Sequence, residues 1–315
     1  RDRMRSLSGV QPSGKLHIAN YLGAIRQFIQ LQESTEGFYF IANLHALTTI
    51  REPEVARQYA YDVALDFLAL GLDPERSSLF MQSDIPQIPE LAWYLSCVTS
   101  MGLLQRCHAY KDKVARGQTP NHGLFAYPVL MAADILAFNS DSVPVGEDQR
   151  QHVEVTRDIA DAFNNTYGET LKIPEAKILK ATGSIPGTDG QKMSKSYGNT
   201  IDIFASKGKL KKMVMGIVTD SKGLDEPKDA ETNNVYNIYR HLASEEDAAT
   251  MKKKLQAGGY GYGHAKKELL NKVHEVFGEA REKREKLAND MDYVEDVLAE
   301  GAAEARRAAD EVLDR

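Results

Sequence analysis

The sequence predicts an α/β protein with a doubly wound parallel sheet and an all-helical C-terminal domain. Over the first two-thirds of the chain, short apolar runs of strand length alternate with amphipathic helical stretches, as in parallel sheets joined by crossover helices. After about Phe204 the strand-like runs disappear and charged helical segments replace them. With 315 residues available, we therefore expect two domains, over 1–204 and 205–315.

Local signals place the elements of the first domain. Three apolar runs have the length and composition of buried strands: GFYFIAN (37–43), SSLFMQS (77–83) and SDSVPVG (140–146). Between the first two, a helix runs from Pro53 to Leu70, since proline suits its first turn and Gly71 its C-terminal cap. Another helix begins near Asn20, and 105–140 is expected to be a helical insertion. This order predicts a Rossmann-like sheet, which binds ligands beyond the carboxyl ends of its strands.

The second domain is predicted to be helical throughout. Three segments have helical patterns: 233–243, 244–257 and 264–315. The run GGYGYG (258–263) separates the last two. SKGKLKKM (206–213) gathers four lysines, which form either a solvated helix face or a contact with nucleic-acid phosphates. These are Lys207, Lys209, Lys211 and Lys212.

Composition excludes several classes of function. The net charge of −6 argues against non-specific adhesion to nucleic acid, but it does not exclude a local basic patch that reads one RNA. Cys97 and Cys107, the two cysteines, supply neither a disulfide framework nor a zinc or iron–sulfur ligand set. No apolar run approaches the roughly 20 residues of a membrane span, and the first residues lack the apolar core of a signal peptide. We therefore expect a cytoplasmic protein without a membrane segment.

The stretch SGVQPSGKLHIANYLGA (8–24) approaches a phosphate-binding P-loop without matching it. Leu16 stands where a P-loop needs Ser or Thr for magnesium, and Pro12 removes one backbone N–H. What remains is a turn between a strand and a helix N-terminus, where unpaired N–H groups favour phosphate. His17 and Asn20 add hydrogen-bond donors there, so an ordinary connecting turn is the weaker interpretation.

The stretch YPVLMAADILAF (127–138) places a carboxylate in an apolar helix that Pro128 is expected to begin. Asp134 shares one helical face with Met131, Ile135 and Phe138. A buried carboxylate is costly without a partner. The face suits a flat aromatic ligand with one polar hydrogen; alternatively, Asp134 pairs with a core arginine or a helix end.

Two further stretches carry polar groups suited to a nucleotide. In VPVGEDQRQH (143–152) a strand end runs into acidic residues that commonly bind ribose hydroxyls, or form a solvated turn. In GQKMSKSYGN (190–199) two lysines and two serines lie between glycines. Such a loop is either a solvated turn or a cationic clamp for a polyphosphate, where positive groups stabilise developing charge.

Together these stretches resemble the class I aminoacyl-tRNA synthetases. HIAN (17–20) resembles the first signature of that class, His-Ile-Gly-His, and KMSKS (192–196) matches the second in full. Longer motifs narrow the resemblance to bacterial-type tryptophanyl-tRNA synthetases across nearly the whole chain. They are the 8–24 stretch, GLFAYPVLMAADIL (123–136), VPVGEDQRQHVEVTRDIADAFN (143–164) and YGYGHAKKEL (260–269).

The resemblance implies a two-step reaction. Tryptophan and ATP, which brings Mg²⁺ with it, form tryptophanyl-adenylate and pyrophosphate, and the tryptophanyl group then passes to tRNA(Trp). The family is homodimeric, so an interface is expected at Pro89–Leu104 or the adjoining insertion. The domain over 205–315 is expected to recognise the anticodon. A pocket sized for tryptophan needs no editing domain, because smaller competitors bury less surface.

The resemblance also assigns residues, position by position. Catalytic roles fall to His17, Asn20, Lys192, Ser194 and Lys195. ATP is expected to contact Gln11, Pro12, Ser13, Ala19, Asn20, Gly146, Glu147, Asp148, Ile185, Lys192, Met193, Ser194, Lys195 and Ser196. Tryptophan is expected to contact His45, Tyr127, Met131, Asp134, Val143, Val145 and Gln149. Asp134 would accept the indole N–H, Tyr127 and Gln149 would hold the polar end, and Lys111 and Lys113 belong to a segment near the active site.

The sequence departs from the family pattern at two places. Ala19 stands where the family usually has glycine, and Asn43-Leu44 precede His45 where it often has Asp-Gln. Two alternatives stay open: a tyrosyl-tRNA synthetase, since a phenol hydroxyl also reaches a carboxylate, and a synthetase-like paralogue that does not charge tRNA.

Overall fold

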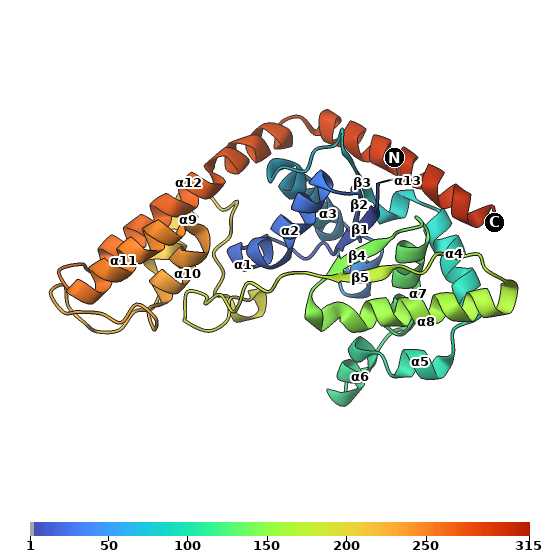
Figure 1. Ribbon diagram of the computed structural model, residues 1–315, viewed down its shortest axis with the longest axis horizontal. Helices are drawn as coiled ribbons and strands as arrows, with labels where there is room; N and C mark the ends of the chain where they lie inside the picture. Colours follow the sequence, from blue (N-terminus) through green and yellow to red (C-terminus); the bar gives the residue numbers. More distant parts are fainter. Residues whose placement is uncertain (1–2) are drawn as a thin grey trace. The chain divides into compact units, whose positions relative to one another are not determined.

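The computed structural model describes residues 3–315 and contains one five-stranded parallel sheet (Figure 1). Its strands are β1 (Arg5–Val10), β2 (Glu36–Ile41), β3 (Ser77–Met81), β4 (Ser142–Val145) and β5 (Glu175–Ile178). They lie in the order β3-β2-β1-β4-β5, so the chain moves outward from β1 to β3 and then crosses to the other side of β1. The predicted doubly wound parallel sheet is confirmed, with its topological switch between β1 and β4.

Helices fill most of the remaining chain. They are α1 (Ile18–Asn20), α2 (Arg26–Gln30), α3 (Pro53–Ala69), α4 (Gln87–Ser96), α5 (Met101–Gln105), α6 (His108–Ala115), α7 (His122–Leu136), α8 (Arg150–Tyr167), α9 (Lys207–Met215), α10 (Asn234–Leu242), α11 (Glu245–Ala257), α12 (Tyr262–Ala288) and α13 (Met291–Leu313). A π-helical turn, Tyr21–Ile25, joins α1 to α2. The predicted helix at 53–70 and the helical character after Phe204 are confirmed.

Two local expectations were wrong. Pro128 lies inside α7 and not in its first turn, because Asn121 begins the helix earlier: its side-chain oxygen accepts a hydrogen bond from the Leu124 N–H at 2.8 Å. Strand β5 was missed because Glu175 and Lys177 interrupt its apolar pattern. As the edge strand it needs no continuous apolar run.

The chain folds into two compact units. The sheet unit contains the chain up to Gly14, Gln27–Lys180 and Leu287–Arg315; the helical unit contains Lys15–Arg26 and Ala181–Lys286. This grouping differs from the expected division at 204/205 in three places. Residues 181–204, which include the KMSKS segment, group with the helices. Lys15–Arg26 groups with the helices, where Tyr21 packs edge-to-face on Phe277 at 5.2 Å. The last 29 residues, Leu287–Arg315, group with the sheet.

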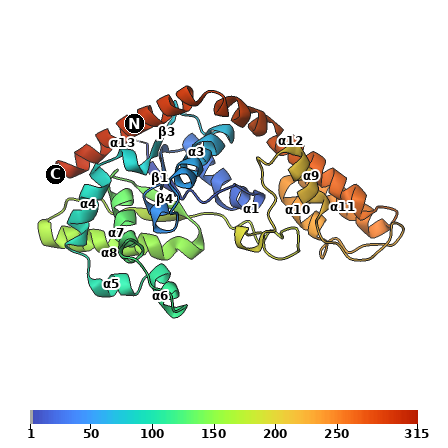
Figure 2. The same cartoon turned by 180° about the vertical axis from the view of Figure 1, so that it is seen from behind.

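Helix α13 belongs to the sheet unit because it packs on β3, beside which it lies in both views (Figures 1 and 2). Gly301 permits this approach, since a Cβ at that position would lie 2.0 Å from the Leu79 carbonyl oxygen. The core of this unit also holds three aromatic rings from β2, β3 and the end of α7. Phe138 stacks on Phe38 at 5.6 Å and meets Phe80 edge-on at 5.5 Å. Burying each ring stabilises the fold by roughly 1.5–3 kcal/mol.

Candidate active site

A cavity of about 430 Å³ opens in the sheet unit and draws on the ends of β1, β2 and β4. This is a usual volume for a small-molecule site. Its walls are mostly apolar and include the side chains of Phe40 and Ile135. A few polar side chains also line it, among them Gln11 and His152. Seven residues assigned from the sequence line it: Gln11, His45, Tyr127, Met131, Val143, Val145 and Gln149.

Asp134 does not line this cavity but lies directly behind His45. Its carboxylate is fully buried and is bound by His45 Nε2 at 2.9 Å. Gln82 Nε2 donates to both carboxylate oxygens, at 2.9 and 2.8 Å. Burial raises the pKa of Asp134, and the hydrogen bonds from His45 and Gln82 oppose that rise. Asp134 thus has two partners within the protein, His45 and Gln82, and neither is the core arginine of the alternative expectation.

Gln82 is a residue that the sequence analysis missed. It is completely buried, and its Oε1 accepts the backbone N–H groups of Leu44 at 3.0 Å and His45 at 3.4 Å. It thereby joins the end of β3 to the turn that carries His45 and to α7. One signal was available: Gln82 is the polar residue that directly follows a buried strand, at the edge of the sheet where ligands bind.

Tyr127 and His152 form a second polar pair on the cavity wall. The Tyr127 hydroxyl lies 3.3 Å from His152 Nδ1, and both rings line the cavity. Burial raises the pKa of Tyr127 to about 12, so its hydroxyl stays protonated near neutral pH. Burial also lowers the pKa of His152, which favours the neutral imidazole. Tyr127 and His152 can therefore form a hydrogen bond as two neutral side chains, which adds no charge to the cavity wall.

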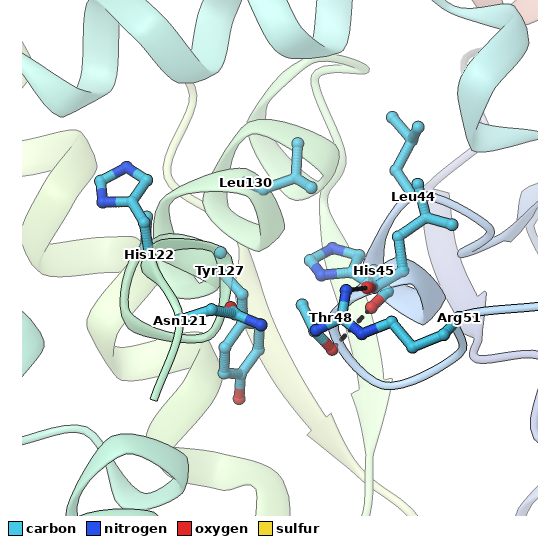
Figure 3. A pocket seen from close by; sticks show the side chains of 11 residues that line it. Leu44, His45, Thr48, Arg51, Asn121, His122, Tyr127 and Leu130 are labelled. Carbon is cyan, nitrogen blue, oxygen red and sulfur yellow. Dashed lines mark hydrogen bonds between the residues drawn. The ribbon is translucent and has the colours of Figure 1, made fainter. Parts of the chain in front are cut away.

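A second cavity, of about 510 Å³, shares His45, Thr48 and Tyr127 with the first (Figure 3). Arg51, Asn121 and His122 line it but do not line the first cavity. The polar side chains serve local structure: Arg51 donates to the Leu47 carbonyl at 3.2 Å, and Asn121 caps α7. His45 and Tyr127 thus line both cavities of the sheet unit.

The residues expected to flank adenine and ribose lie where β4 ends. Gly146 is followed by a single 3₁₀ turn, Glu147–Gln149. Arg150 binds both oxygens of Glu147, at 2.9 and 2.8 Å, and these hydrogen bonds lower the pKa of that carboxyl. Glu147 is therefore engaged within the turn, whereas Asp148 is exposed and Gln149 reaches the cavity.

Pro12 and Ser13, also assigned to ATP, follow β1 in this unit. Lys111 and Lys113 lie on α6. Of the two, Lys111 lines a separate open cavity of about 460 Å³.

The remaining assigned residues lie in the helical unit, beginning with HIAN. Ile18 donates its backbone N–H to the Ile201 carbonyl at 3.1 Å, which ties this turn to the chain that follows KMSKS. The His17 Nδ1 accepts the Asn20 N–H at 3.3 Å, and Asn20 Oδ1 accepts the His17 N–H at 3.3 Å. This reciprocal cap begins α1 at Ile18, slightly before the expected start near Asn20.

His17 is a neutral donor at physiological pH. Its side chain is 4% exposed, and burial together with the positive charge of Lys195 lowers its pKa to about 4. Because Nδ1 accepts a hydrogen bond, the ring proton lies on Nε2. Ala19, two residues on, is part of α1, so its backbone conformation does not require the glycine that the family usually has.

The KMSKS segment is anchored by its apolar residue and presents its lysines to solvent. Met193 is buried against Ile185, whose carbonyl accepts the Met193 N–H at 2.9 Å. Lys192, Lys195 and Ser196 are exposed, and the Ser194 and Ser196 hydroxyls lie 2.9 Å apart. The segment can therefore offer positive charge and hydroxyl groups to a polyanion without losing its anchor.

The assigned residues thus fall into two groups, one in each unit. Among residues 3–315, no three His, Cys, Asp or Glu side chains are grouped so as to hold a metal ion. Within the same range, no helix has both the length and the apolar character needed to cross a membrane.

Known proteins match this chain over nearly its whole length. The family model of the class I tRNA synthetases (W and Y) matches residues 1–278. The tryptophan–tRNA ligase of Rhodopirellula baltica is 55% identical over 312 residues, which cover 99% of this chain and 98% of the relative. That of Fusobacterium nucleatum is 56% identical over 310 residues, with 98% and 95% covered.

A solved structure extends the match to three dimensions. The tryptophanyl-tRNA synthetase of Campylobacter jejuni, complexed with ADP and tryptophan, is 48% identical and superposes with a TM-score of 0.94. The match covers 99% of this chain and 98% of that one. By sequence and by fold, this chain belongs to the class I tRNA synthetases (W and Y), in their bacterial tryptophanyl branch.

Proposed function

We propose that this protein is a tryptophan–tRNA ligase. It activates L-tryptophan with Mg·ATP to tryptophanyl-adenylate and pyrophosphate, and then transfers the tryptophanyl group to tRNA(Trp). One observation carries the proposal: six of the seven residues assigned to tryptophan, all but Asp134, line one largely apolar cavity of about 430 Å³. The protein shares 48% identity with a synthetase whose structure contains ADP and tryptophan.

In the first step the carboxylate of tryptophan attacks the α-phosphorus of ATP, and the bond to the bridging oxygen of pyrophosphate breaks. Lys192 and Lys195 bind the leaving pyrophosphate, whose charge grows as that bond breaks. His17 and Asn20 contact phosphate oxygens, and the neutral Nε2–H of His17 does so without repelling the nearby lysine. Tyr127 and Gln149 hold the polar end of the amino acid.

Magnesium is proposed to arrive bound to the phosphates of ATP and to neutralise part of their charge. The cation would be held by the phosphates of the substrate, and the positive charges of Lys192 and Lys195 would add to it.

Isotope exchange between ATP and pyrophosphate tests the proposal. We expect exchange that depends on tryptophan and that is at least about 100-fold weaker with phenylalanine, since a site that pairs a donor rejects ligands lacking it. Exchange with tyrosine should also be weaker, because its smaller ring buries less surface in the cavity. Exchange that depends on tyrosine would identify a tyrosyl enzyme. Absence of exchange with any amino acid would identify a paralogue that does not charge tRNA.

The helical unit is proposed to bind tRNA(Trp), with anticodon recognition in 205–315. Four lysines of α9 are exposed in a protein of net charge −6: Lys207, Lys209, Lys211 and Lys212. Replacing them with glutamine should weaken tRNA binding and flatten its salt dependence, because each phosphate contact releases counterions. Amino-acid-dependent exchange should be unchanged. An unaltered salt slope would leave these lysines as a solvated helix face.

A homodimer in the cytoplasm is proposed, with its interface at Pro89–Leu104. This region spans α4 and α5 and exposes three large apolar side chains that a second copy would cover. Trp93 is 69% exposed, Met101 62% and Tyr94 43%. Trp93→Glu should shift sedimentation from dimer to monomer. A wild-type protein that sediments as a monomer would refute the dimer.

A further inference from the structure

One buried amide contacts the KMSKS segment from outside the motif. Asn199 is 2% exposed and lies three residues after Ser196. Its Nδ2 donates to Asp189 Oδ1 at 2.7 Å and to the Lys192 carbonyl at 3.0 Å, with a longer contact of 3.4 Å to the Gln191 carbonyl. Its Oδ1 accepts the Ser194 N–H at 2.9 Å. The side chain thus uses both of its donors and one acceptor within the loop.

These bonds hold the backbone on both sides of Met193. Lys192 and Ser194 flank that residue, and Asn199 binds the carbonyl of one and the N–H of the other. Over residues 181–200, which the structure describes in full, regular structure is limited to two features. They are the isolated bridge between Pro186 and Lys192 and a single 3₁₀ turn, Lys195–Tyr197. One side chain therefore supplies hydrogen bonds that a helix or sheet would provide elsewhere.

The surrounding chain is shaped to receive this amide. A Cβ on Gly187 would lie 2.3 Å from the Asn199 side chain and 2.5 Å from its carbonyl oxygen. Thr188 donates its N–H to that carbonyl at 2.9 Å. The Thr188 backbone thus binds the backbone of Asn199, while the Asn199 side chain binds the backbone of the KMSKS segment.

We propose that Asn199 is the positioning residue of the KMSKS segment. It fixes the backbone at Lys192 and Ser194, so that the lysines meet pyrophosphate from one defined conformation. This inference rests on the proposed function. Groups that are already oriented stabilise a transition state best, and small displacements of such groups cost large factors in rate.

The side-chain chemistry requires an amide at this position. Asn199→Asp keeps the shape but replaces the donor with an acceptor that faces Asp189 Oδ1 and the Lys192 carbonyl. Without an N–H between them, the facing oxygen atoms would repel each other. Asn199→Ala removes every side-chain bond at once. Both variants should weaken or remove hydrogen bonds between residue 199 and the backbone of the KMSKS segment, and neither changes Lys192 or Lys195.

Kinetics of adenylate formation test the inference. We expect Asn199→Asp and Asn199→Ala to lower kcat for adenylate formation by on the order of 10- to 100-fold, as for a displaced catalytic group. The Kd for tryptophan should stay within about twofold, since its cavity lies in the sheet unit. Transfer to tRNA from chemically prepared tryptophanyl-adenylate should also be unchanged, because that step releases no pyrophosphate.

A matched control separates positioning from loss of stability. Asn233 is another buried asparagine of the helical unit, and its side chain caps α10 through the Tyr236 N–H at 2.9 Å. Asn233→Ala should lower Tm but leave kcat for adenylate formation unchanged. If Asn199→Ala and Asn233→Ala reduce kcat equally at equal loss of Tm, the positioning role is refuted.

A double-mutant cycle identifies the groups through which Asn199 acts. In a Lys192→Ala/Lys195→Ala background, Asn199→Ala should reduce the residual rate by less than about threefold, because the groups it positions are gone. A full additive loss would overturn the inference. Should the Asn199 variants fail to fold, Asp189→Ala removes one of its exposed partners, and unchanged kcat in that variant would overturn the inference too. Failure of the proposed function is distinct, since wild-type protein would then show no exchange.

Discussion

The cavity of the sheet unit and the KMSKS segment of the helical unit hold their polar side chains in opposite ways. Behind the cavity wall, side chains hold side chains: Asp134 and Gln82 are fully buried, and Asp134 binds both Gln82 and His45. In the segment, both lysines are exposed, and hydrogen bonds through Met193 and Asn199 hold the backbone.

The difference follows from what each region has to bind. Recognition of one N–H on an aromatic ring needs a site without water, because an unmatched polar group then costs about 1–3 kcal/mol. A polyphosphate needs mobile positive charge that stays hydrated until the anion arrives, since burying an unpaired ammonium group is far more costly. The cavity therefore supplies specificity, and the segment supplies charge.

The largest expected effect concerns the charge of the segment. Lys195→Ala should slow adenylate formation by on the order of 10²–10³-fold, as does the loss of one preorganised donor in other enzymes. Tryptophan affinity measured without ATP should hardly change, because the cavity lies in the other unit. Single-turnover formation of the adenylate measures the rate. An unaltered rate would remove Lys195 from the chemistry.

The next effect concerns the buried cluster. Asp134→Asn should lower tryptophan affinity by about 5- to 150-fold, because it weakens the acceptor proposed for the indole N–H. The affinity of an analogue with sulfur in place of the ring nitrogen should change less, since that ligand has no donor to lose. Equilibrium titration with both ligands gives the ratio.

Met131→Leu is the control for Asp134→Asn, because it changes the cavity wall with little change in volume. Both ligands should respond to it alike. If Asp134→Asn likewise leaves the ratio of the two affinities unchanged, Asp134 is a structural carboxylate that orients His45. Asp134→Ala is a less suitable variant than Asp134→Asn, because it would leave both His45 and Gln82 without this hydrogen-bond partner.

A third prediction concerns His17, a buried polar group of the helical unit. Its pKa is about 4 in the folded protein, against an ordinary value of 6.5. Between these two pH values the unfolded chain binds a proton at His17 that the folded protein does not bind. His17 therefore lowers stability progressively as pH falls from 6.5 to 4, and it contributes no such loss above 6.5.

His17→Asn removes this titration and keeps a side chain that can cap α1. Urea denaturation at several pH values should show a smaller loss of stability between pH 6.5 and 4 in the variant than in the wild type. Equal losses in the two proteins would mean that His17 is protonated in the folded state.

The smallest expected effect concerns Ala19. If its methyl group presses on adenine, Ala19→Gly should tighten ATP binding and leave tryptophan binding unchanged. The same change should lower stability by up to about 1 kcal/mol, because Ala19 lies in a helical turn. Titration with ATP and thermal denaturation measure the two effects. Unchanged or weaker ATP binding would show that the site is adapted to alanine.

The sequence by itself determined the elements whose signals are local. Three strands follow from short apolar runs, and α3 follows from Pro53 at its start and Gly71 just past its end. The cavity residues could be assigned through the family resemblance, because the motifs that carry it are each continuous in the chain. Each of these signals depends only on residues close to one another in the sequence.

Only the tertiary structure decided which residues and elements from distant parts of the chain contact one another. Asp134 meets His45 and Gln82, which are 89 and 52 positions away in the chain. Helix α13 returns to β3 because Gly301 admits the Leu79 carbonyl, and the charged strand β5 exists because β4 offers it an edge. Hydrogen bonding and close packing act between atoms within a few ångströms, and distance along the chain does not reveal which atoms folding brings that close.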